Sequence, residues 1–418
     1  MAEYKKVTLP NGVRFIAEEL KEFHSVAIGI CALIGSRYET DSENGLSHFI
    51  EHMMFKGTKN RTARQIALEI DALGGMLNAS TTKEYTYFYT KVVHQNQTKA
   101  FELLVDILQN PSFPQSAFKV EKNVVLQEIK NAEDTPDDLV FFELAKALFN
   151  GHPLSNPVLG TKENVQKFKR EDLVKFYEEN YTLDNLIISA AGRINYDALL
   201  DIASKINLKP KKKEREELPL PVETEKLRVK RMKGLKQVYI AMATRTFPYV
   251  DERKYPLMVL GTLFGGGMGS RLFQRLREKE GLVYLVASFP DFFKDTGVFG
   301  IYFVTSKNLI KKAFKAIFEE MEKFVKKGIK KNELNNAKEH LKGGMVLVLE
   351  DTSSRMSRLL KQEIYLGKQM TVDEVIQKVE NVKIDDVMGL AEEFLEPSKY
   401  SVSAVGDISE KDFDFLNK

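Results

Sequence analysis

The chain has 418 residues, of which 43% are hydrophobic and 29% charged, and its 62 basic and 59 acidic residues nearly cancel. This length favours two domains rather than one, and the composition is typical of a globular protein with substantial cores. The balanced charge excludes a general electrostatic attraction to nucleic acid or acidic membranes, and the single cysteine, Cys31, excludes an internal disulfide and a cysteine-based zinc site.

The N-terminal segment does not resemble a targeting signal. Residues 1–19 read MAEYKKVTLPNGVRFIAEE and lack both the apolar core of a signal peptide and the Arg- and Ser-rich composition of a transit peptide. No stretch reaches the roughly 18 uninterrupted apolar residues that a membrane span needs. We therefore expect a soluble, cytoplasmic protein with no membrane partner and no nucleic-acid partner.

The first elements along the chain are a strand, a helix and a second strand region. Residues 26–35, VAIGICALIG, predict a buried strand in which Cys31 is an inert thiol. A helix is expected next, with an N-cap offered by residues 41–43 (Asp-Ser-Glu) and a stop at Gly57. Residues 77–93 are rich in Thr, Tyr and Phe and predict strand structure.

A charged, proline-containing segment divides the chain nearly in half. Residues 207–226 read NLKPKKKEREELPLPVETEK, and because Glu and Lys interleave there, they indicate a solvated linker rather than a nucleic-acid patch. The two halves resemble each other, which indicates a duplicated α+β domain. The matching segments are 26–35 with 238–247 and 131–151 with 348–368, and residues 282–288 predict a further strand. The predicted domains are 1–208 and 227–418, joined by a linker at 209–226.

The predicted helix after residue 45 contains the stretch HFIEH, which combines His48, Glu51 and His52. Because a helix turns about 100° per residue, these side chains share one face, opposite an apolar face around Leu46. Two histidines one turn apart can bind one zinc ion, and Glu51 would act as the general base that activates water. This order reverses the H-E-x-x-H signature of zinc proteases. Exposed or hydrogen-bonded helix histidines are the alternative.

The repeat indicates that these polar residues are not needed for folding. When Val26 is aligned with Val238, the three residues fall opposite Leu260, Leu263 and Phe264. The equivalent helix of the second half is therefore simply apolar. The first half must carry two histidines and a glutamate for another reason.

A catalytic zinc ion needs a third protein ligand and an open position. The other histidines of the chain stand in no supporting pattern. In a helix predicted over residues 116–134, Glu121 and Glu128 fall on the same inward row as the apolar side chains. An unpaired carboxylate is costly there, so we expect a metal or a cation to meet them. Tolerated carboxylates at the edge of the core are the alternative.

Four further stretches, together with HFIEH, match one known family. They are GGMLNASTTKEYTYFY at 74–89, EKNVVLQEI at 121–129, NGHPLSNPVLG at 150–160 and GGGMGSRLFQRLREKEGLVYLVAS at 265–288. Through them the whole chain resembles the pitrilysin/insulinase family of zinc peptidases (inverzincins), in particular the short, two-domain type similar to mitochondrial processing peptidase and its bacterial relatives. The resemblance implies an α+β fold of two homologous domains, each a mainly antiparallel sheet packed with helices.

The resemblance implies a role for each residue of the zinc site. His48, His52 and Glu128 would be the ligands of one Zn²⁺ per chain, and Glu51 would be the general base. Glu121, the second glutamate of the ligand helix, would support catalysis by orienting a ligand or the water.

The resemblance also implies how a peptide substrate is bound. Asn78 and Ala79 match an edge strand that binds substrate by β-augmentation, the alternative being an ordinary sheet strand. Arg277 and Tyr284 match an Arg–Tyr pair that contacts the substrate carbonyl and the tetrahedral oxygen; without the family they would be a solvated charge and a core residue. Larger members take this pair from the last of four domains, so a two-domain chain would take it from a partner. This predicts a homodimer with a composite active site.

Three functions compete at this point. The leading hypothesis is a zinc metalloendopeptidase that hydrolyses extended peptides in an enclosed dimer chamber. The second is a non-catalytic core or partner subunit of a processing-peptidase-like complex, although such chains commonly lose parts of the zinc motif that this chain retains. The third, a zinc-dependent hydrolase of non-peptide substrates, is disfavoured by the features that recognise a peptide backbone. The glycine run at 265–269 lacks a following Gly-Lys-Ser/Thr and is not a phosphate loop, and His152 is expected to be structural.

Overall fold

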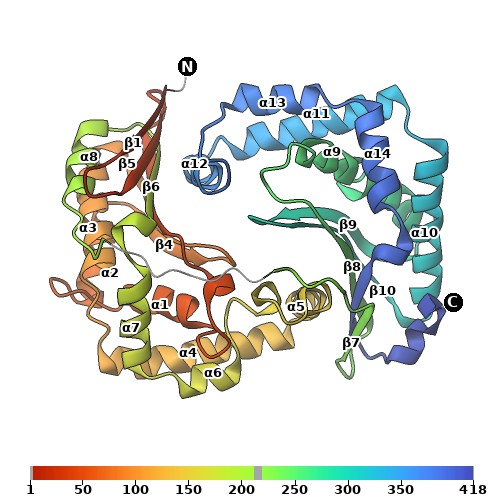
Figure 1. Ribbon diagram of the computed structural model, residues 1–418, viewed down its shortest axis with the longest axis horizontal. Helices are drawn as coiled ribbons and strands as arrows, with labels where there is room; N and C mark the ends of the chain where they lie inside the picture. The colour runs from red at the N-terminus through yellow and green to blue at the C-terminus, as the bar shows by residue number, and fades with distance from the viewer. Residues whose placement is uncertain (1–2, 211–218, 418) are drawn as a thin grey trace. The chain divides into compact units, whose positions relative to one another are not determined.

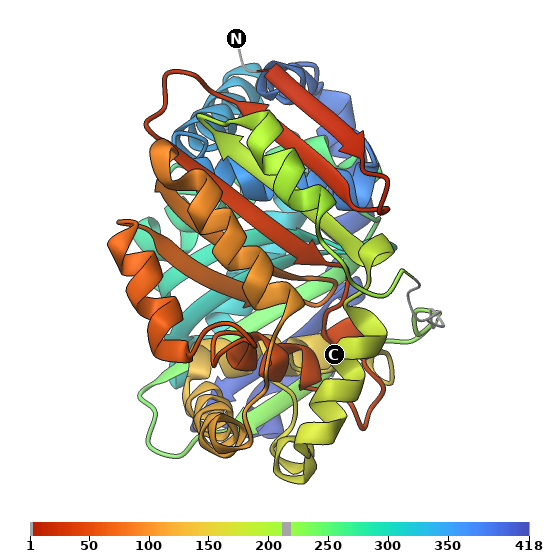
Figure 2. The same ribbon diagram turned by 90° about the vertical axis from the view of Figure 1, so that its left-hand side faces the viewer.

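The computed structural model describes residues 3–210 and 219–417, drawn in Figures 1 and 2. These residues form two compact units. The first contains the described residues up to Asn131, those from Asn156 to the linker, and Val348–Gln369; the second contains Ala132–Ser155, Pro219–Leu347 and the residues from Met370 onward. Residues 211–218 of the predicted linker lie outside the described residues, and the predicted domain boundaries stay a prediction.

The first unit is built on a sheet whose described strands run in the order β1-β2-β6-β3-β5-β4. Only β2 and β6 are parallel neighbours among these strands, and the other pairs are antiparallel. The strands are β1 (Glu3–Thr8), β2 (Arg14–Glu19), β3 (Ser25–Ala32), β4 (Met76–Thr81), β5 (Thr86–Val93) and β6 (Leu186–Gly192).

Helices cover both faces of this sheet, because alternate residues of each strand point to opposite sides. Val26 and Ile28 of β3 join a core that also takes side chains from α3 and α8, whereas Ala27 and Cys31 pack with α12. Figure 1 shows α3 and α8 on one side of the sheet and α12 on the other, and Figure 2 looks onto α3 and α8. The helices are α1 (Leu46–Met54), α2 (Ala63–Ala72), α3 (Gln97–Gln109), α4 (Gln115–Asp134), α6 (Lys162–Lys167), α7 (Arg170–Asn180), α8 (Tyr196–Ser204) and α12 (Thr352–Leu366).

The face beneath α12 includes several small residues beside larger ones such as Ile16 and Ile187. Gly29 of β3 is in closest contact there, since a Cβ atom at this position would lie 2.7 Å from Sδ of Met356. Cys31 on the same face is fully buried, and burial raises the pKa of its thiol, in agreement with the predicted inert cysteine. The buried carboxylate of Glu18 pairs with Arg355 of α12 at 2.8 Å and so fixes the helix on the sheet.

The second unit repeats this architecture. Its described strands run in the order β7-β11-β8-β10-β9, with β7 and β11 parallel and the other neighbours antiparallel. The strands are β7 (Leu227–Arg231), β8 (Gln237–Thr246), β9 (Val283–Phe292), β10 (Gly297–Ser306) and β11 (Ser401–Gly406). The helices are α5 (Pro136–Phe149), α9 (Lys254–Gly265), α10 (Ile310–Lys327), α11 (Lys331–Val348), α13 (Val372–Glu380) and α14 (Ile384–Phe394), together with a π-helix over Phe273–Lys279.

The duplication inferred from the sequence is present in the strand order. β2, β6, β3, β5 and β4 of the first sheet correspond in order and direction to β7, β11, β8, β10 and β9 of the second, and β1 has no counterpart among the described strands. The two sheets are mainly antiparallel and packed with helices. The predicted α+β class with two homologous sheet-and-helix domains is therefore confirmed.

One helix of each unit comes from the opposite half of the chain. α5, from the first half, packs its apolar face on Ala241 and Ala243 of the second sheet. α12, from the second half, packs on the first sheet. These are the two segments, 131–151 and 348–368, whose likeness the sequence revealed. Each unit thus combines residues from both sides of the predicted linker.

Two details of the predicted elements change. Residues 77–93 form not one strand but the hairpin of β4 and β5, because the hydroxyl of Thr82 accepts the backbone N–H groups of Glu84 and Tyr85 and turns the chain. The strand expected at 282–288 extends to Phe292. Within the described residues, no helix combines the length and the hydropathy needed to cross a bilayer.

Candidate metal centre and peptide-binding edge

The helix that carries HFIEH, α1, begins later than the sequence suggested. Its N-cap is Gly45, at φ 107°, and the predicted N-cap residues 41–43 lie outside the capping position. The cap is supplied instead by Glu39, whose carboxylate accepts the backbone N–H groups of Gly45 at 2.8 Å and Ser47 at 2.6 Å. Burial raises the pKa of Glu39, while these two hydrogen bonds lower it. A carboxylate at this position accepts hydrogen bonds from backbone N–H groups that have no partner within the helix. Its negative charge also interacts favourably with the positive end of the helix dipole.

The two faces of α1 have the predicted characters. Leu46, Phe49 and Met53 are buried in the core, and the ring of Phe49 stacks on Phe118 of α4 with centroids 5.0 Å apart. Because this stacking fixes α1 beside α4, the polar face of α1 meets the carboxylates of α4.

Three potential metal ligands converge between these helices. Oε2 of Glu128 lies 3.6 Å from Nε2 of His48 and 3.3 Å from Nε2 of His52, and all three atoms lie within 4.8 Å of one another. Atoms bound at about 2.1 Å to one tetrahedral zinc ion lie about 3.4 Å apart. The donor set of two imidazoles and one carboxylate is also one that zinc accepts. The residues present therefore fit a zinc ion.

Electrostatics favour the ligand form of His48. Burial and, to a smaller extent, the neighbouring His52 together lower the pKa of His48 to about 3, so the imidazole is neutral at physiological pH. Its side chain is only 8% exposed, and its Nδ1 has no hydrogen-bond partner among the described residues. Nε2, the other ring nitrogen, is the atom directed at Glu128.

Glu121 lies behind His52 rather than with the three convergent atoms. Its Oε2 is 3.2 Å from Nδ1 of His52, and its Oε1 pairs with Nζ of Lys56 at 2.9 Å. The carboxylate is thus buried between an imidazole and an ammonium group and can fix the orientation of the His52 ring. Sequence reasoning missed Lys56, which lies in the turn just after α1, four residues beyond His52.

Glu51 stands beside the three potential ligands, and the last residue of β4 donates a hydrogen bond to it. Its Oε2 accepts the hydroxyl proton of Thr81 at 2.5 Å. Burial raises the pKa of Glu51, and the Thr81 hydrogen bond and His52 oppose that shift. A partly desolvated carboxylate next to a potential metal ion is suited to accept a proton.

The strand that bears Asn78 and Ala79 is an edge strand. β4 pairs only with β5 among the described strands and ends the sheet, and α1 packs beside it. Asn78 is exposed and Ala79 half-buried. The backbone of β4 is therefore open to an added strand beside the helix that carries His48 and His52, which the sequence alone could not establish.

Arg277 and Tyr284 come together in the second unit. Arg277 lies on the π-helix, and its guanidinium carbon is 5.8 Å from the centre of the Tyr284 ring at the start of β9. Tyr284 is 69% exposed, so the alternative that it is a core residue is wrong. Both side chains are free to meet a ligand.

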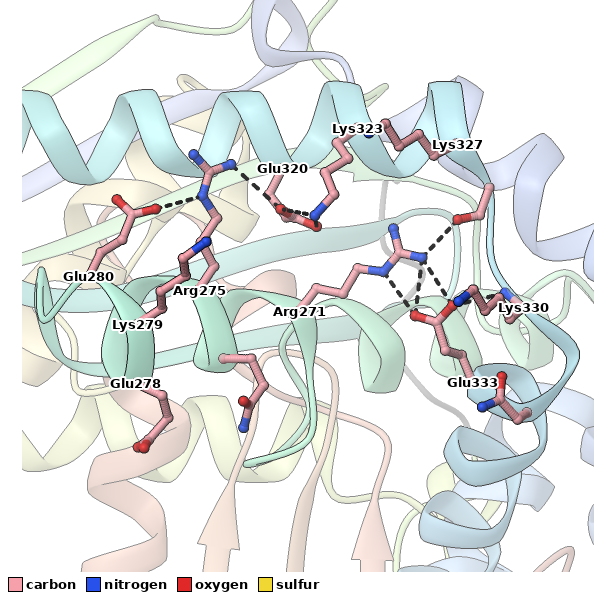
Figure 3. A pocket seen from close by; sticks show the side chains of 13 residues that line it. Arg271, Arg275, Glu278, Lys279, Glu280, Glu320, Lys323, Lys327, Lys330 and Glu333 are labelled. Carbon is pink, nitrogen blue, oxygen red and sulfur yellow. Dashed lines mark hydrogen bonds and ion pairs between the residues drawn. The ribbon is translucent and has the colours of Figure 1, made fainter.

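The π-helix is anchored by ion pairs on its other side. Figure 3 shows the groove of about 1030 Å³ along it, into which Arg271 and Arg275 point. Arg271 pairs with Glu333 of α11 at 3.1 Å, and Arg275 pairs with Glu280 at 2.9 Å and contacts α10. These contacts fix the backbone from which Arg277 projects.

Two lesser expectations concern His152 and the glycine run. His152 is buried, and its Nδ1 accepts the backbone N–H of Leu154 at 3.1 Å, which suits a structural residue. The glycines border a cavity of about 240 Å³ in the second unit, where a ring nitrogen of His340 lies 3.2 Å from the carbonyl oxygen of Gly266.

Comparison with known proteins places this geometry in a family. The sequence profile "Insulinase (Peptidase family M16)" matches residues 14–162, and the profile "Peptidase M16 inactive domain" matches residues 167–341. An uncharacterised zinc protease of Bacillus subtilis is 40% identical over 93% of this chain and 94% of its own length. The chain belongs to the M16 family of peptidases.

Other similarities of this M16 peptidase agree. An uncharacterised zinc protease of Rickettsia felis is 34% identical over 95% of this chain and 96% of its own length. The crystal structure of a protease from Helicobacter pylori matches with a TM-score of 0.86 at 22% identity, covering 97% of this chain and all of that one, which supports the fold. The predicted resemblance to the pitrilysin/insulinase family, short two-domain type, is therefore confirmed.

Proposed function

We propose that this chain is a zinc metalloendopeptidase that binds one Zn²⁺ through His48, His52 and Glu128. The observation that carries the proposal is the convergence of their three ligand atoms within 4.8 Å, with Glu128 at 3.6 and 3.3 Å from the two histidine nitrogens, close to the spacing of about 3.4 Å around one tetrahedral ion. Membership of a zinc peptidase family supports it independently. When bound, zinc would supply the Lewis-acid polarisation of the scissile carbonyl.

Glu51 would perform the proton transfers. Its carboxylate takes a proton from the attacking water as the water oxygen bonds to the carbonyl carbon, and it then gives that proton to the amine nitrogen as the C–N bond breaks. Glu121 holds the ring of His52 through Nδ1, so that Nε2 keeps its direction. A cytoplasmic location stays a prediction.

The substrate would be an extended peptide. Its backbone would add to β4 beside Asn78 and Ala79, since β4 is an open edge close to α1. Arg277 and Tyr284 offer a guanidinium and a phenol hydroxyl, groups able to donate to a substrate carbonyl and to the oxyanion.

We also propose a homodimer in which Arg277 and Tyr284 act on the peptide held by the partner subunit, inside an enclosed chamber. Mixing inactive Glu51→Gln with inactive Arg277→Ala would then restore part of the activity, because one mixed site keeps both groups. Absence of recovery after verified subunit exchange would contradict action between chains.

A second candidate function is a non-catalytic subunit of a processing-peptidase-like complex. The match of residues 167–341 to an M16 inactive-domain profile is compatible with it, whereas the retained ligand set of the first unit opposes it. Digestion of a mixed peptide library separates the two. The peptidase hypothesis predicts cut peptides from the zinc-loaded wild type and none from Glu51→Gln; an intact library with stoichiometric zinc bound would favour the subunit.

Zinc binding has its own test. Glu128→Gln should lower the zinc content measured by atomic absorption, because a neutral amide is a poorer ligand than a carboxylate, while Glu51→Gln should retain zinc. Purified wild-type protein without stoichiometric zinc after metal loading would overturn the site.

A further inference from the structure

Glu51 is held by a residue at the end of the strand proposed to bind substrate. The hydroxyl of Thr81, the last residue of β4, donates to Oε2 of Glu51 at 2.5 Å. This distance is within the range of about 2.5–2.7 Å for a hydroxyl donating to a carboxylate, which is among the stronger hydrogen bonds in proteins. We propose that Thr81 is a positioning residue for the base, which fixes the orientation of the Glu51 carboxylate for proton transfer. The proposal rests on the peptidase function proposed above.

The position of Thr81 is fixed by the sheet. Thr81 stands directly opposite Thr86 of β5, which is fully buried and donates its own hydroxyl to the carbonyl oxygen of Ile34 at 2.9 Å. A threonine in a strand has few χ1 rotamers because its Cβ is branched. The direction of the Thr81 hydroxyl therefore follows from the backbone of β4 and does not need to be ordered when substrate arrives.

Thr81 holds the carboxylate of Glu51 through two of its groups. Its hydroxyl donates to Oε2, and its backbone N–H also hydrogen-bonds the carboxylate, so Thr81 fixes the direction in which Glu51 presents its oxygens. Thr81 also lies three residues after Asn78 on the same strand. One strand would thus position both the added peptide and the Glu51 carboxylate. Their relative placement would then depend on few intervening contacts.

The same strand pair contains a matched control. Thr90 of β5 is also fully buried, but its hydroxyl has no hydrogen-bond partner among the described residues, and it faces Leu77 in the register rather than Glu51. Thr90→Val removes the same hydroxyl from the same sheet. The loss of the Thr90 hydroxyl should leave kcat unchanged, since this hydroxyl makes no contact with Glu51.

The first experiment compares zinc-loaded wild type, Thr81→Val, Thr81→Ser and Thr90→Val on one peptide cut by the wild type. Thr81→Val should lower kcat by about tenfold to a hundredfold with little change in KM, the loss expected for one hydrogen bond to a charged group. Thr81→Ser, which keeps the hydroxyl, should recover most of kcat, and zinc content should be equal in all four proteins. A Thr81→Val variant with the kcat of wild type, or with a raised KM and unchanged kcat, would overturn the proposal.

The second experiment needs no activity. A double-mutant cycle of Thr81→Val and Glu51→Ala is measured by thermal unfolding of the metal-free proteins. If the hydroxyl holds the carboxylate, the effect of Thr81→Val on Tm should be larger in the wild type than in the Glu51→Ala protein. Additive effects would contradict the interaction, and Thr81→Ala replaces Thr81→Val if the valine variant does not fold.

The two experiments separate this proposal from the one on which it rests. A wild type that cuts no peptide refutes the peptidase function, while the unfolding cycle still reports on the Thr81–Glu51 pair. An active wild type with an inactive Glu51→Gln and a fully active Thr81→Val supports the peptidase and refutes the positioning role.

Discussion

Helices α1 and α9 occupy equivalent places in the two units, after β3 and after β8, yet only α1 carries two histidines and a glutamate on one face. The residues of α9 opposite His48, Glu51 and His52 are Leu260, Leu263 and Phe264, and all three are buried in the second core. The comparison teaches that the repeated scaffold is stable when these positions are apolar. His48, Glu51 and His52 are therefore a local substitution on a helix that both units share. Contacts with α4 and β4 offset the free-energy cost of burying these polar side chains.

The largest effect expected from this comparison is on catalysis. Glu51→Gln keeps the shape of the side chain but cannot accept a proton, so kcat should fall by about 10²–10⁴-fold, the usual contribution of a general base. Zinc content and Tm should remain near those of the wild type. Steady-state kinetics on a peptide found in the library digest would check this. Turnover equal to wild type would show that Glu51 is not the base.

The reverse exchange should damage the second unit. Leu260→His places an imidazole in a fully buried position without a carboxylate opposite, so the free energy of unfolding should fall by about 3 kcal/mol. Chemical denaturation measures this. The conservative Leu260→Met is the control and should cost much less, because it preserves volume and polarity. If Leu260→His left the free energy of unfolding unchanged, α9 would tolerate a histidine at this position as well as α1 does.

The helix starts differ as well. Glu39 caps α1 through two amides and is buried, whereas Asp251, at the equivalent place before α9, accepts the amide of Arg253 at 2.8 Å and also pairs with its exposed side chain. Glu39→Ala should therefore lower the free energy of unfolding by about 2 kcal/mol, and Asp251→Ala by less than about 1 kcal/mol. Thermal unfolding of the metal-free proteins compares the pair. Equal losses would remove the distinction between the two caps.

The smallest effect concerns folding without metal. His48→Leu copies Leu260 and removes a buried Nδ1 that lacks a partner, so the metal-free protein should gain about 1 kcal/mol of unfolding free energy. The same variant should lose zinc. Unfolding curves recorded with a chelator present would test the first statement, and a marked loss of metal-free stability would show that His48 also serves the fold.

The residues that carry local patterns could be predicted from the sequence. The spacing of His48, Glu51 and His52 defines one helix face, and the inward row of the next long helix contains Glu121, which is buried as expected. Glu128, by contrast, is only half-buried, and its selection as third ligand came from the family resemblance. Its position opposite His52 became visible only when α1 and α4 were packed together.

Features that depend on distant parts of the chain could not be predicted. The edge position of β4 follows from the order in which six strands pair, and the cap by Glu39 is a contact made across a loop. Thr81 gave no signal because a threonine in a strand is ordinary. The exchange of α5 and α12 was hidden by the likeness of the two segments, since each suits either sheet.

The exchange of α12 limits how early the first unit can be completed during synthesis. The first unit includes Val348–Gln369, so its sheet keeps Ala27 and Cys31 uncovered until α12 has left the ribosome, when most of the chain has been made. The second sheet, in contrast, meets a helix that was synthesised long before it. The N-terminal unit thus cannot close before the rest of the chain is made, although domains of most chains finish folding in the order in which they are translated. The second unit waits as well, because β11 lies between β7 and β8 in its sheet and is synthesised after α12.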